Sequence, residues 1–396
     1  MTTKELMALS DACVMGTYTR FPIMLVRGDG STVWDSEGKE YIDCVAGIAV
    51  CSLGHSHRGV VEAIKRQADR LTHVSNLYYI EPQILFATLL VEHSFADRAF
   101  FCNSGAEANE AAIKLARKYA HDTMEGDRYE IITMENSFHG RTLTTVAATG
   151  QKRFQTGFDP LPGGFRYVPF DDIGALEDAL TDHTCAVMVE PIQGEGGIKI
   201  PGNDYLKEVR KICDDRGILL IFDEVQVGMG RTGRLFAYEE TGVTPDIMTL
   251  AKAIGNGFPM GAMLATEGVA AAFTPGSHAS TFGGNPLAMA AGMAVMEAML
   301  NDGILEGCRE TGAYFVERLH ELKERHAIIE EVRGRGLIIG MELSRDGGDL
   351  VRAAMERGVL INCTCGNILR FVPPLTISRG EVDRVIDVID EVVGQC

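Results

Sequence analysis

Positive charge and aromatic residues are both scarce in this sequence. Lysine and arginine number 37 against 55 aspartates and glutamates, which gives a formal net charge of −18 at pH 7. Aromatic residues make up 7% of the chain, with a single tryptophan. A surplus of negative charge disfavours nucleic acids and anionic membranes as general partners, although it allows local basic pockets that bind small acids. We therefore expect neither nucleic acid nor membrane as a partner.

Long hydrophobic runs are also missing. Residues 1–20 have charged side chains scattered through them and contain no apolar stretch of signal-peptide length. The most apolar helix-like run, residues 286–300, is too short and too rich in alanine to span a bilayer. We therefore expect a cytosolic protein.

Metal and nucleotide motifs are absent as well. The ten cysteines show no paired metal-ligand spacing, and we interpret the lone Cys-x-Cys at residues 363–365 as structural. His55 and His57 lie in a turn without a nearby carboxylate or cysteine, so we expect no metal site. No Walker A loop is present, and no G-x-G-x-x-G opens a strand–helix unit, which disfavours nucleotide binding. A chain of 396 residues needs no disulfide framework, so reduced thiols are expected.

What the sequence does contain is a regular alternation of short apolar runs and helical patterns. Between about residues 95 and 265 this rhythm predicts an α/β fold with a large, doubly wound, mostly parallel sheet. Glycine-separated short runs predict a β-rich meander near the N-terminus, over residues 20–53. Amphipathic helices (about 304–325, 347–358, 379–394) and strands near 329–343 and 368–372 follow. We expect an N-terminal arm (1–55), a large domain (56–300) and a C-terminal segment (301–396) that forms a smaller α+β domain with the arm.

One lysine stands out in the large predicted domain. Lys252 directly follows the apolar run 247–250, and Gly255, Gly257 and Pro259 then break regular structure. A lysine between a buried strand and a glycine-rich turn is poorly solvated. Burial lowers the pKa of a lysine, and a neutral amine is a nucleophile toward carbonyls. The alternative is an ordinary surface lysine on a loop.

An acidic strand end upstream favours the first interpretation. Residues 218–222 predict a central parallel strand, and Asp223 and Glu224 follow at its carboxyl end, where open α/β sheets bind ligands. A helix N-cap or a metal ligand is an alternative role for such an acid. A buried lysine and a buried carboxylate on neighbouring strand ends suit pyridoxal phosphate, which needs a lysine amine and an anionic partner for its pyridinium nitrogen.

A small-residue turn at residues 103–105 supplies a candidate phosphate site. Gly105 precedes an alanine-rich helix that opens at Ala106. Such a turn presents backbone N–H groups and the positive end of the helix dipole to an anion. Ser104 and Glu107 also fit a capping box, so an ordinary capped helix is the alternative. Beside the lysine and the aspartate, a phosphate site is the better interpretation.

Polar and aromatic side chains at other predicted strand ends complete the candidate site. Phe138 or His139 could stack on a planar ring, although a core aromatic is equally common. Arg141 could clamp a carboxylate, with a solvated arginine as the alternative. Glu190 is the acid at the next strand end that we expect to face the site.

Two later stretches add further candidates. Ser280 and Thr281 lie in a polar, glycine-rich loop and could bind a phosphate or a substrate, although ordinary turn chemistry is the alternative. Arg370 precedes a rigid Phe-Val-Pro-Pro stretch that could hold its guanidinium in a cleft.

Together these motifs resemble the class III, pyridoxal-phosphate-dependent aminotransferases of fold type I. The resemblance covers nearly the whole chain from Tyr18 onward. The motifs that carry it are Ser104-Gly-Ala-Glu-Ala-Asn-Glu-Ala, Phe138-His-Gly-Arg141, Glu190-Pro-Ile-Gln-Gly-Glu-Gly, Asp223-Glu-Val-Gln226, Leu250-Ala-Lys252 and Ser280-Thr-Phe-Gly-Gly-Asn-Pro.

The resemblance implies a role for each cofactor residue. Lys252 binds the cofactor covalently and moves the proton, and Asp223 pairs with the pyridine nitrogen. The resemblance also implies that Gln226 contacts the phenolic oxygen and that Val225 and Phe138 cover the two ring faces. The phosphate would be bound by Ser104, Gly105 and Ala106, together with Thr281 of a second subunit. A site shared in this way implies a homodimer.

Within this family the chain most resembles members that act on N-acetylornithine. Residues 361–376 resemble their C-terminal signature, and Ile48 stands where ornithine-specific members carry a tyrosine. The resemblance implies that Arg141 holds the α-carboxylate of acetylornithine and the distal carboxylate of glutamate, that Ser280 contacts acetylornithine, and that Arg370 holds the α-carboxylate of glutamate. We expect Glu190 to cover Arg370 by a salt bridge when acetylornithine is bound.

The implied reaction transfers the δ-amino group of acetylornithine to 2-oxoglutarate, within arginine biosynthesis. Alternatives on the same fold use succinylornithine, succinyl-diaminopimelate, ornithine or 4-aminobutyrate. An aminomutase needs no external keto acid, and the Arg141 and Arg370 pair favours the transferase over it. A non-enzymatic binding module is disfavoured by the intact lysine, aspartate and phosphate turn.

Overall fold

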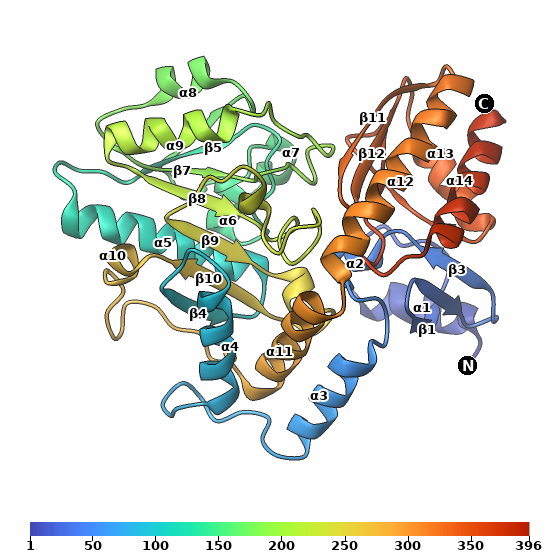
Figure 1. Cartoon of the computed structure of the whole chain (residues 1–396), viewed down its shortest axis with the longest axis horizontal. Helices are drawn as coiled ribbons and strands as arrows, with labels where there is room; N and C mark the ends of the chain where they lie inside the picture. The colour runs from blue at the N-terminus through green and yellow to red at the C-terminus, as the bar shows by residue number, and fades with distance from the viewer. Residues whose placement is uncertain (396) are drawn as a thin grey trace.

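The computed structural model describes residues 1–395, and a seven-stranded sheet forms its largest part (Figure 1). Its strands, in spatial order, are β4 (Arg98–Cys102), β10 (Gly261–Ala265), β9 (Ile247–Leu250), β8 (Leu219–Asp223), β7 (Thr184–Val189), β5 (Glu130–Met134) and β6 (Phe165–Val168). The strands from β9 to β6 pair in parallel, which confirms the predicted mostly parallel sheet.

Strand β10 is the exception, because it runs antiparallel to both of its neighbours. Only residues 251–260 connect it to β9. A parallel pair needs a crossover of about a dozen residues or more, so this short connection forces an antiparallel return. The connection contains Lys252, which is therefore held between two paired strands.

Helices cover both faces of the sheet, as expected of a doubly wound fold. Neighbouring residues of one strand belong to different cores: Ile131 packs in the core that includes α5 (Gly105–Thr123), and Ile132 packs in the core that includes α8 (Ile173–Ala179) and α9 (Tyr205–Arg216). Successive side chains of a strand point to opposite faces, so a sheet buried on both sides needs apolar residues at every position. The continuous apolar runs in the sequence reflect this.

The two ends of the chain meet in one smaller sheet. Strands β1 (Leu25–Asp29), β2 (Thr32–Asp35) and β3 (Glu40–Asp43) form the predicted antiparallel meander, and β13 (Val359–Leu360) adds to β3 in parallel. A third sheet contains β11 (Ile329–Arg335), β12 (Ile338–Leu343), β15 (Ile368–Phe371) and β14 (Asn362–Thr364). The domain boundaries at residues 55 and 300 stay a prediction.

Helices α12 (Ile304–Arg325), α13 (Gly348–Glu356) and α14 (Arg379–Gly394) lie beside these small sheets (Figure 1). The first and last have the predicted bounds, and α13 begins one residue later and ends two residues earlier than expected. The other helical elements are α2 (Ala46–Ala49), α3 (Arg58–Ala68), α4 (Glu81–Glu92), α6 (Leu143–Ala148), α7 (Lys152–Gln155), η1 (Ala237–Glu240), η2 (Lys252–Gly255), α10 (Glu267–Ala270) and α11 (Pro286–Asn301).

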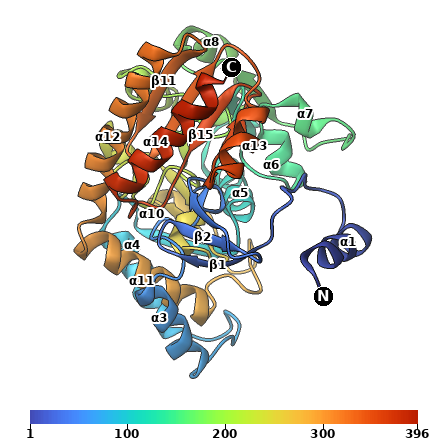
Figure 2. The same cartoon turned by 90° about the vertical axis from the view of Figure 1, so that its right-hand side faces the viewer.

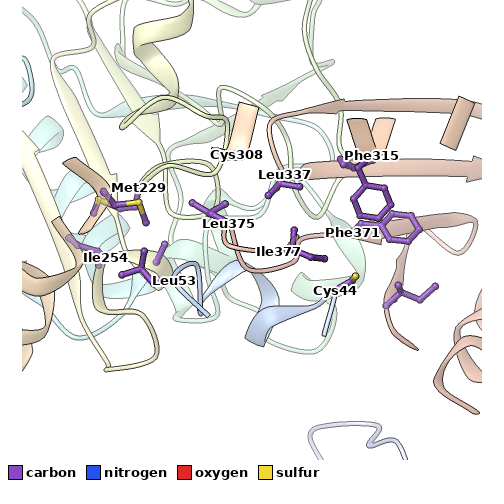
Figure 3. Close-up of a cluster of buried hydrophobic side chains, with 14 of the residues drawn as sticks. Cys44, Leu53, Met229, Ile254, Cys308, Phe315, Leu337, Phe371, Leu375 and Ile377 are labelled. Carbon is purple, nitrogen blue, oxygen red and sulfur yellow. The ribbon is translucent and has the colours of Figure 1, made fainter. Parts of the chain in front are cut away.

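One apolar core joins the large sheet's surroundings to the C-terminal part. It extends from Leu53, Met229 and Ile254 to Phe315 and Phe371, as Figure 3 shows. Close packing transmits position across such a core, because filled interiors deform little. Residues on the C-terminal sheet are therefore placed firmly against the carboxyl ends of the large sheet.

None of the residues of helix α1 (Thr3–Cys13) is buried. Its side view in Figure 2 places it apart from the body of the protein. No helix was predicted here from the sequence, although Thr2 and Glu5 form a capping box that starts it.

Within residues 1–395, no single helix is long and apolar enough to cross a membrane. By length and composition alone, α11 and α12 meet that requirement only as a pair, bent by 68°.

Candidate active site

A pocket of about 370 Å³ opens at the carboxyl ends of the parallel strands. It brings together most of the residues selected from the sequence: Ser104, Gly105, Ala106, Phe138, Arg141, Glu190, Asp223, Val225, Gln226 and Lys252. It is also lined by residues without a predicted role, among them Val50, Asn103, Asn109 and Phe258. The functional role of each of these residues stays a prediction.

Lys252 begins η2, separated from β9 by Ala251 alone, and lines the pocket. Its φ of +51° lies in the left-handed region, which a side chain of this kind rarely adopts. Burial lowers the pKa of its amine, and the nearby charges of Glu195 and Asp223 oppose that shift. Strained backbone at a pocket wall is typical of functional residues.

Asp223 is the last residue of β8 and is held by three donors. Its Oδ2 accepts a hydrogen bond from Asn109 Nδ2 at 2.7 Å and contacts His139 Nδ1 at 2.8 Å. Its Oδ1 accepts from the Val225 backbone N–H at 3.0 Å. Asn109 in turn accepts from the Thr249 hydroxyl at 2.7 Å, which fixes its amide. The carboxylate is therefore firmly oriented in the pocket wall.

His139 belongs to the same buried network. Burial disfavours its charged form, but the hydrogen bond and the charge of Asp223 outweigh burial and raise its pKa. The sequence suggested His139 only as a ring-stacking alternative to Phe138, and no role was predicted for Asn109. Asn109 lies one turn into an alanine-rich helix, so a lone polar residue on the buried face was the available signal.

Glu224 points away from this site. Its carboxylate accepts backbone N–H groups of Ala237 at 2.6 Å and Tyr238 at 2.7 Å, and burial raises its pKa to about 8. It therefore caps η1 instead of lining the pocket.

The turn before α5 combines both interpretations made from the sequence. Ser104 accepts from the Glu107 backbone N–H at 3.2 Å, and Glu107 accepts from the Asn103 backbone N–H at 2.5 Å. The first N–H groups of the helix still face the pocket without an intrahelical partner. A Cβ on Gly105 would lie 2.7 Å from Val225 Cγ1, so a side chain there would fill the cradle.

The acid that covers Arg370 is not the expected one. Arg370 lies on β15 with 1% of its side chain exposed, and its Nη1 is 2.5 Å from Glu195 Oε1. The expected partner, Glu190, instead accepts backbone N–H groups of Phe138 at 3.1 Å and Gly194 at 3.5 Å. Burial raises the pKa of Glu190 to about 8. Glu190 sits at the strand end itself, whereas Glu195 is presented by the turn that follows, which reaches the C-terminal sheet.

Gln226 and Arg141 also contact their surroundings in defined ways. Gln226 Oε1 accepts from Arg370 Nη1 at 3.2 Å, so the predicted cofactor residue touches the ion pair. The Arg141 guanidinium lies 4.0 Å from the centre of the Phe154 ring and 5.4 Å from that of Phe138. Stacking on two rings holds this cation at the pocket mouth.

The structure does not bring Ser280 and Thr281 to this pocket. Ser280 is half-buried and Thr281 is exposed, and both line a separate hollow of about 1040 Å³. Ser280 Oγ accepts from Asn103 Nδ2 at 3.2 Å, and Asn103 lines the pocket, so the two sites adjoin. A contribution of Thr281 to the site of a second subunit stays a prediction.

His55 has a partner that the sequence did not reveal. Its Nε2 is 2.8 Å from Asp43 Oδ2, at the end of β3, and a hydrogen bond with Asp43 raises its pKa to about 10. The expectation that His55 has no carboxylate nearby was therefore wrong, because the chain between Asp43 and His55 folds back and brings the two side chains together. Within residues 1–395, no group of three or more His, Cys, Asp or Glu side chains is arranged to hold a metal ion.

An amine nucleophile, an oriented aspartate and a helix N-terminus surround one pocket on a doubly wound sheet. This set of donors fits pyridoxal phosphate, whose aldehyde, ring nitrogen and phosphate need those three groups. The fold and the site together define a pyridoxal-phosphate type of enzyme. The chain belongs to the class-III aminotransferase family, which it matches over residues 14–393.

Individual relatives agree with this assignment. The acetylornithine aminotransferase of Caldanaerobacter subterraneus subsp. tengcongensis is 55% identical over 383 residues, 96% of this chain and 97% of the relative. The crystal structure of the ornithine aminotransferase of Toxoplasma gondii ME49 has a TM-score of 0.96 at 35% identity, covering 100% of this chain and 96% of that one. The N-acetylornithine aminotransferase of Stenotrophomonas maltophilia K279a has a TM-score of 0.86 at 40% identity, covering 98% of both chains.

Proposed function

We propose that this aminotransferase moves the δ-amino group of N2-acetyl-L-ornithine to 2-oxoglutarate. The products are N-acetyl-L-glutamate 5-semialdehyde and L-glutamate, and the cellular setting is arginine biosynthesis in the cytosol. The observation that carries the proposal is that Lys252 and Asp223 line one pocket, whose Gln226 hydrogen-bonds Arg370 of the Glu195–Arg370 pair. Relatives named acetylornithine aminotransferase, 48–55% identical over most of the chain, support the choice of substrate.

Pyridoxal phosphate is the proposed cofactor, and when bound it supplies the electron sink for cleavage of the substrate C–H bond. Asp223 would pair with the ring nitrogen and Gln226 with the phenolic oxygen. Val225 and Phe138 would cover the ring faces. The phosphate would be held by the residues that open α5, namely Ser104, Gly105 and Ala106.

Lys252 is the proposed base. Burial lowers the pKa of its amine, which raises the neutral fraction that can bind a carbonyl or accept a proton. Its anchorage between β9 and β10 fixes the amine relative to the Asp223 carboxylate. This fixed geometry reduces the entropy cost of each proton transfer.

Two arginines give the pocket two ways of binding acids. Arg141 would hold the α-carboxylate of acetylornithine or the distal carboxylate of glutamate. Arg370 would hold the α-carboxylate of glutamate, and Glu195 would neutralise it when acetylornithine is bound. Glu195 would thus take the role that was expected of Glu190 from the sequence. An unpaired, buried guanidinium is costly, so a built-in carboxylate lets the amine substrate bind without leaving that charge exposed to apolar surroundings.

Ornithine is the nearest competing substrate, because solved ornithine aminotransferases share the fold. Ile48 favours the acylated amine. It stands two residues before Val50, which lines the pocket, and it offers no hydroxyl to a free α-ammonium. Ser280 remains a proposed contact of the acetylornithine substrate.

A homodimer is the proposed assembly. Large apolar side chains are exposed in the segment before α4, with Leu77 at 83%, Tyr78 at 68% and Tyr79 at 97% exposure. Phe282, next to Thr281, is 61% exposed. An exposed apolar patch of this kind favours a protein interface. Pairing there would let Thr281 reach the phosphate site of the second subunit.

The test is a single half-reaction without keto acid. The visible absorbance of the bound cofactor is followed after adding N-acetylornithine, N-succinylornithine, succinyl-diaminopimelate, ornithine or 4-aminobutyrate separately. We expect the fastest loss of the band with N-acetylornithine, and its recovery on adding 2-oxoglutarate. Faster conversion of another amine would move the enzyme to that substrate, and recovery without any keto acid would indicate an aminomutase.

A further inference from the structure

The turn that carries Glu195 is hydrogen-bonded by a second arginine, Arg333 on β11. We call residues 194–198 the Glu195 loop. Arg333 Nη2 donates to the Gly197 carbonyl at 2.7 Å, and its Nε donates to the carbonyls of Gly197 at 3.1 Å and Ile198 at 3.0 Å. The loop belongs to the large sheet by sequence, yet its carbonyls are bound by the C-terminal sheet.

Arg333 is itself fixed in place. Its Nη1 donates to Glu331 at 2.6 Å and to Glu342 at 2.7 Å, and its side chain is only 12% exposed. A guanidinium with all of its nitrogens engaged has a single orientation, because its donors form a rigid planar fork. The position of the Glu195 loop is therefore set by the C-terminal sheet.

Arg333 and Arg370 lie in the same cross-strand row of that sheet. Arg333 is opposite Gly340 of β12, and Gly340 is opposite Arg370 of β15. Residues directly opposite in antiparallel strands point to the same face, so both guanidinium groups stand on one face with a glycine between them. The glycine leaves a gap in the row.

Ile198 of the Glu195 loop lies over that gap. It is fully buried, and a Cβ on Gly340 would be 3.1 Å from Ile198 Cβ. The end of the loop is thus bound by Arg333 and rests on Gly340, and Glu195, near its start, meets Arg370 at 2.5 Å. We call this cross-strand row of Arg333, Gly340 and Arg370 the seat of the loop, because its two arginines bind the loop from both sides.

We propose that Arg333 and Gly340 are positioning residues that set how strongly Glu195 competes with a substrate carboxylate for Arg370. This inference rests on the proposed function, in which Arg370 binds the α-carboxylate of a dicarboxylic substrate. A firmly seated loop keeps Glu195 on Arg370 and disfavours dicarboxylates. A loosened loop releases Arg370 and favours them. The seat therefore sets the balance between the amine donor and the dicarboxylate acceptor.

The test measures binding without turnover. Glutarate has two carboxylates but neither an amino nor a keto group, so it cannot react. Its affinity for the cofactor-loaded protein is measured by calorimetry for the parent, Arg333→Met, Arg333→Lys and Gly340→Ala. We expect the Met variant to bind glutarate on the order of fivefold more tightly, as disruption of a coupled pair allows. The Lys and Ala variants should show smaller gains.

The sign of the change separates positioning from other effects. Removing the positive charge of Arg333 alone would weaken the binding of a dianion, and general loosening of the fold would weaken it too. The matched control is Arg335→Met, which removes the same charge from the same strand at a residue that contacts Glu240 at 3.7 Å. We expect no gain in that control.

Two further variants separate failure of this inference from failure of the proposed function. Glu195→Gln should bind glutarate at least as tightly as Arg333→Met, and Arg370→Met should lose glutarate binding. If Arg370→Met binds glutarate like the parent, Arg370 does not bind the substrate carboxylate, and the proposed function loses its second carboxylate-binding residue. If Arg370→Met loses binding but Arg333→Met and Gly340→Ala both bind like the parent, the seat is not what positions Glu195.

Discussion

Lys252 illustrates how one residue can be prepared by its surroundings. The strands on either side fix its backbone, and burial lowers the pKa of its amine against the opposing charges of Glu195 and Asp223. The second of these acids is oriented by donors from α5 and from residue 139. The reactivity of the amine therefore depends on groups drawn from distant parts of the chain.

The first prediction at this scale concerns the amine itself. Lys252→Ala should lower turnover of N-acetylornithine by about a thousandfold or more, because a positioned acid–base group contributes on that order. Lys199→Ala, at an exposed lysine, is the control and should retain activity. Steady-state kinetics with both variants measure the effect. Turnover of the Lys252 variant within tenfold of the parent would remove the lysine from the proposed mechanism.

The second residue-scale prediction concerns the pH dependence of stability. Asp43 raises the pKa of His55 to about 10 in the folded state, whereas the unfolded value is about 6.5. The protonated form is thus favoured by folding, so this contribution is complete below about pH 6.5 and disappears as the pH rises to about 10. His55→Gln should cost about 1–2 kcal/mol at pH 6, after allowance for solvent screening, and little at pH 10.

Denaturant unfolding of the parent and His55→Gln at both pH values provides the measurement, with circular dichroism confirming the fold. His57→Gln is the matched control, since no Asp or Glu lies within ion-pairing distance of its ring among residues 1–395. A stability gap that stays constant from pH 6 to pH 10 would contradict the linkage.

The site residues could be found from the sequence where the chemistry depends on a strand end. Lys252 and Asp223 directly follow apolar runs, so their placement at one sheet edge follows from strand length alone. Glu190 and Glu195 could not be told apart in this way. Both lie in one short motif, and only the path of the turn after β7 decides which acid reaches Arg370.

At the scale of elements, the junction of β4 and α5 matters most for the cofactor. Gly105 begins the helix against Val225, and the space between them is closed to a side chain. The glycine lets the first turn of the helix pack closely against the Val225 side chain, with its free N–H groups at the pocket. The sequence showed the glycine but not its neighbour, since Val225 comes from a strand end far along the chain.

Gly105→Ala therefore should weaken pyridoxal phosphate binding. The new Cβ would lie 2.7 Å from Val225 Cγ1, so the turn that would hold the phosphate has to move away from Val225. Overpacking of this kind costs about 1–3 kcal/mol, which corresponds to a loss of affinity of roughly fivefold to 150-fold. Equilibrium titration of the cofactor-free protein with pyridoxal phosphate measures it. Gly268→Ala, with open space around its position, is the control and should bind like the parent.

The whole molecule contains three sheets, and the sequence predicted them unequally. The large sheet was foreseen because its strands are buried on both faces and read as continuous apolar runs. The pairing of β3 with β13 was not, because β13 has only two residues and lies more than 300 positions from its partner. Long-range pairing of so short a strand leaves no local pattern.

The prediction at this scale is the assembly. We expect a mass in sedimentation equilibrium near twice the 43.0 kDa of the chain. Tyr79→Asp places a charge in the exposed apolar segment, so it should shift the protein toward monomer and also weaken cofactor binding, because Thr281 of the second subunit is lost. Tyr129→Asp, on a residue 40% exposed outside that segment, is the control. A parent protein that sediments as a monomer with full cofactor affinity would contradict the shared site.

The union of β3 with β13 also determines when the protein can fold during synthesis. The meander leaves the ribosome early, yet the outer edge of β3 stays unpaired until nearly the whole chain has been translated. At 5–20 residues per second, roughly 15–60 seconds separate the two strands. For that time the N-terminal strands offer an unpaired edge to any other nascent chain, so production of this enzyme should depend on translation speed and on chaperones more strongly than its compact final form suggests.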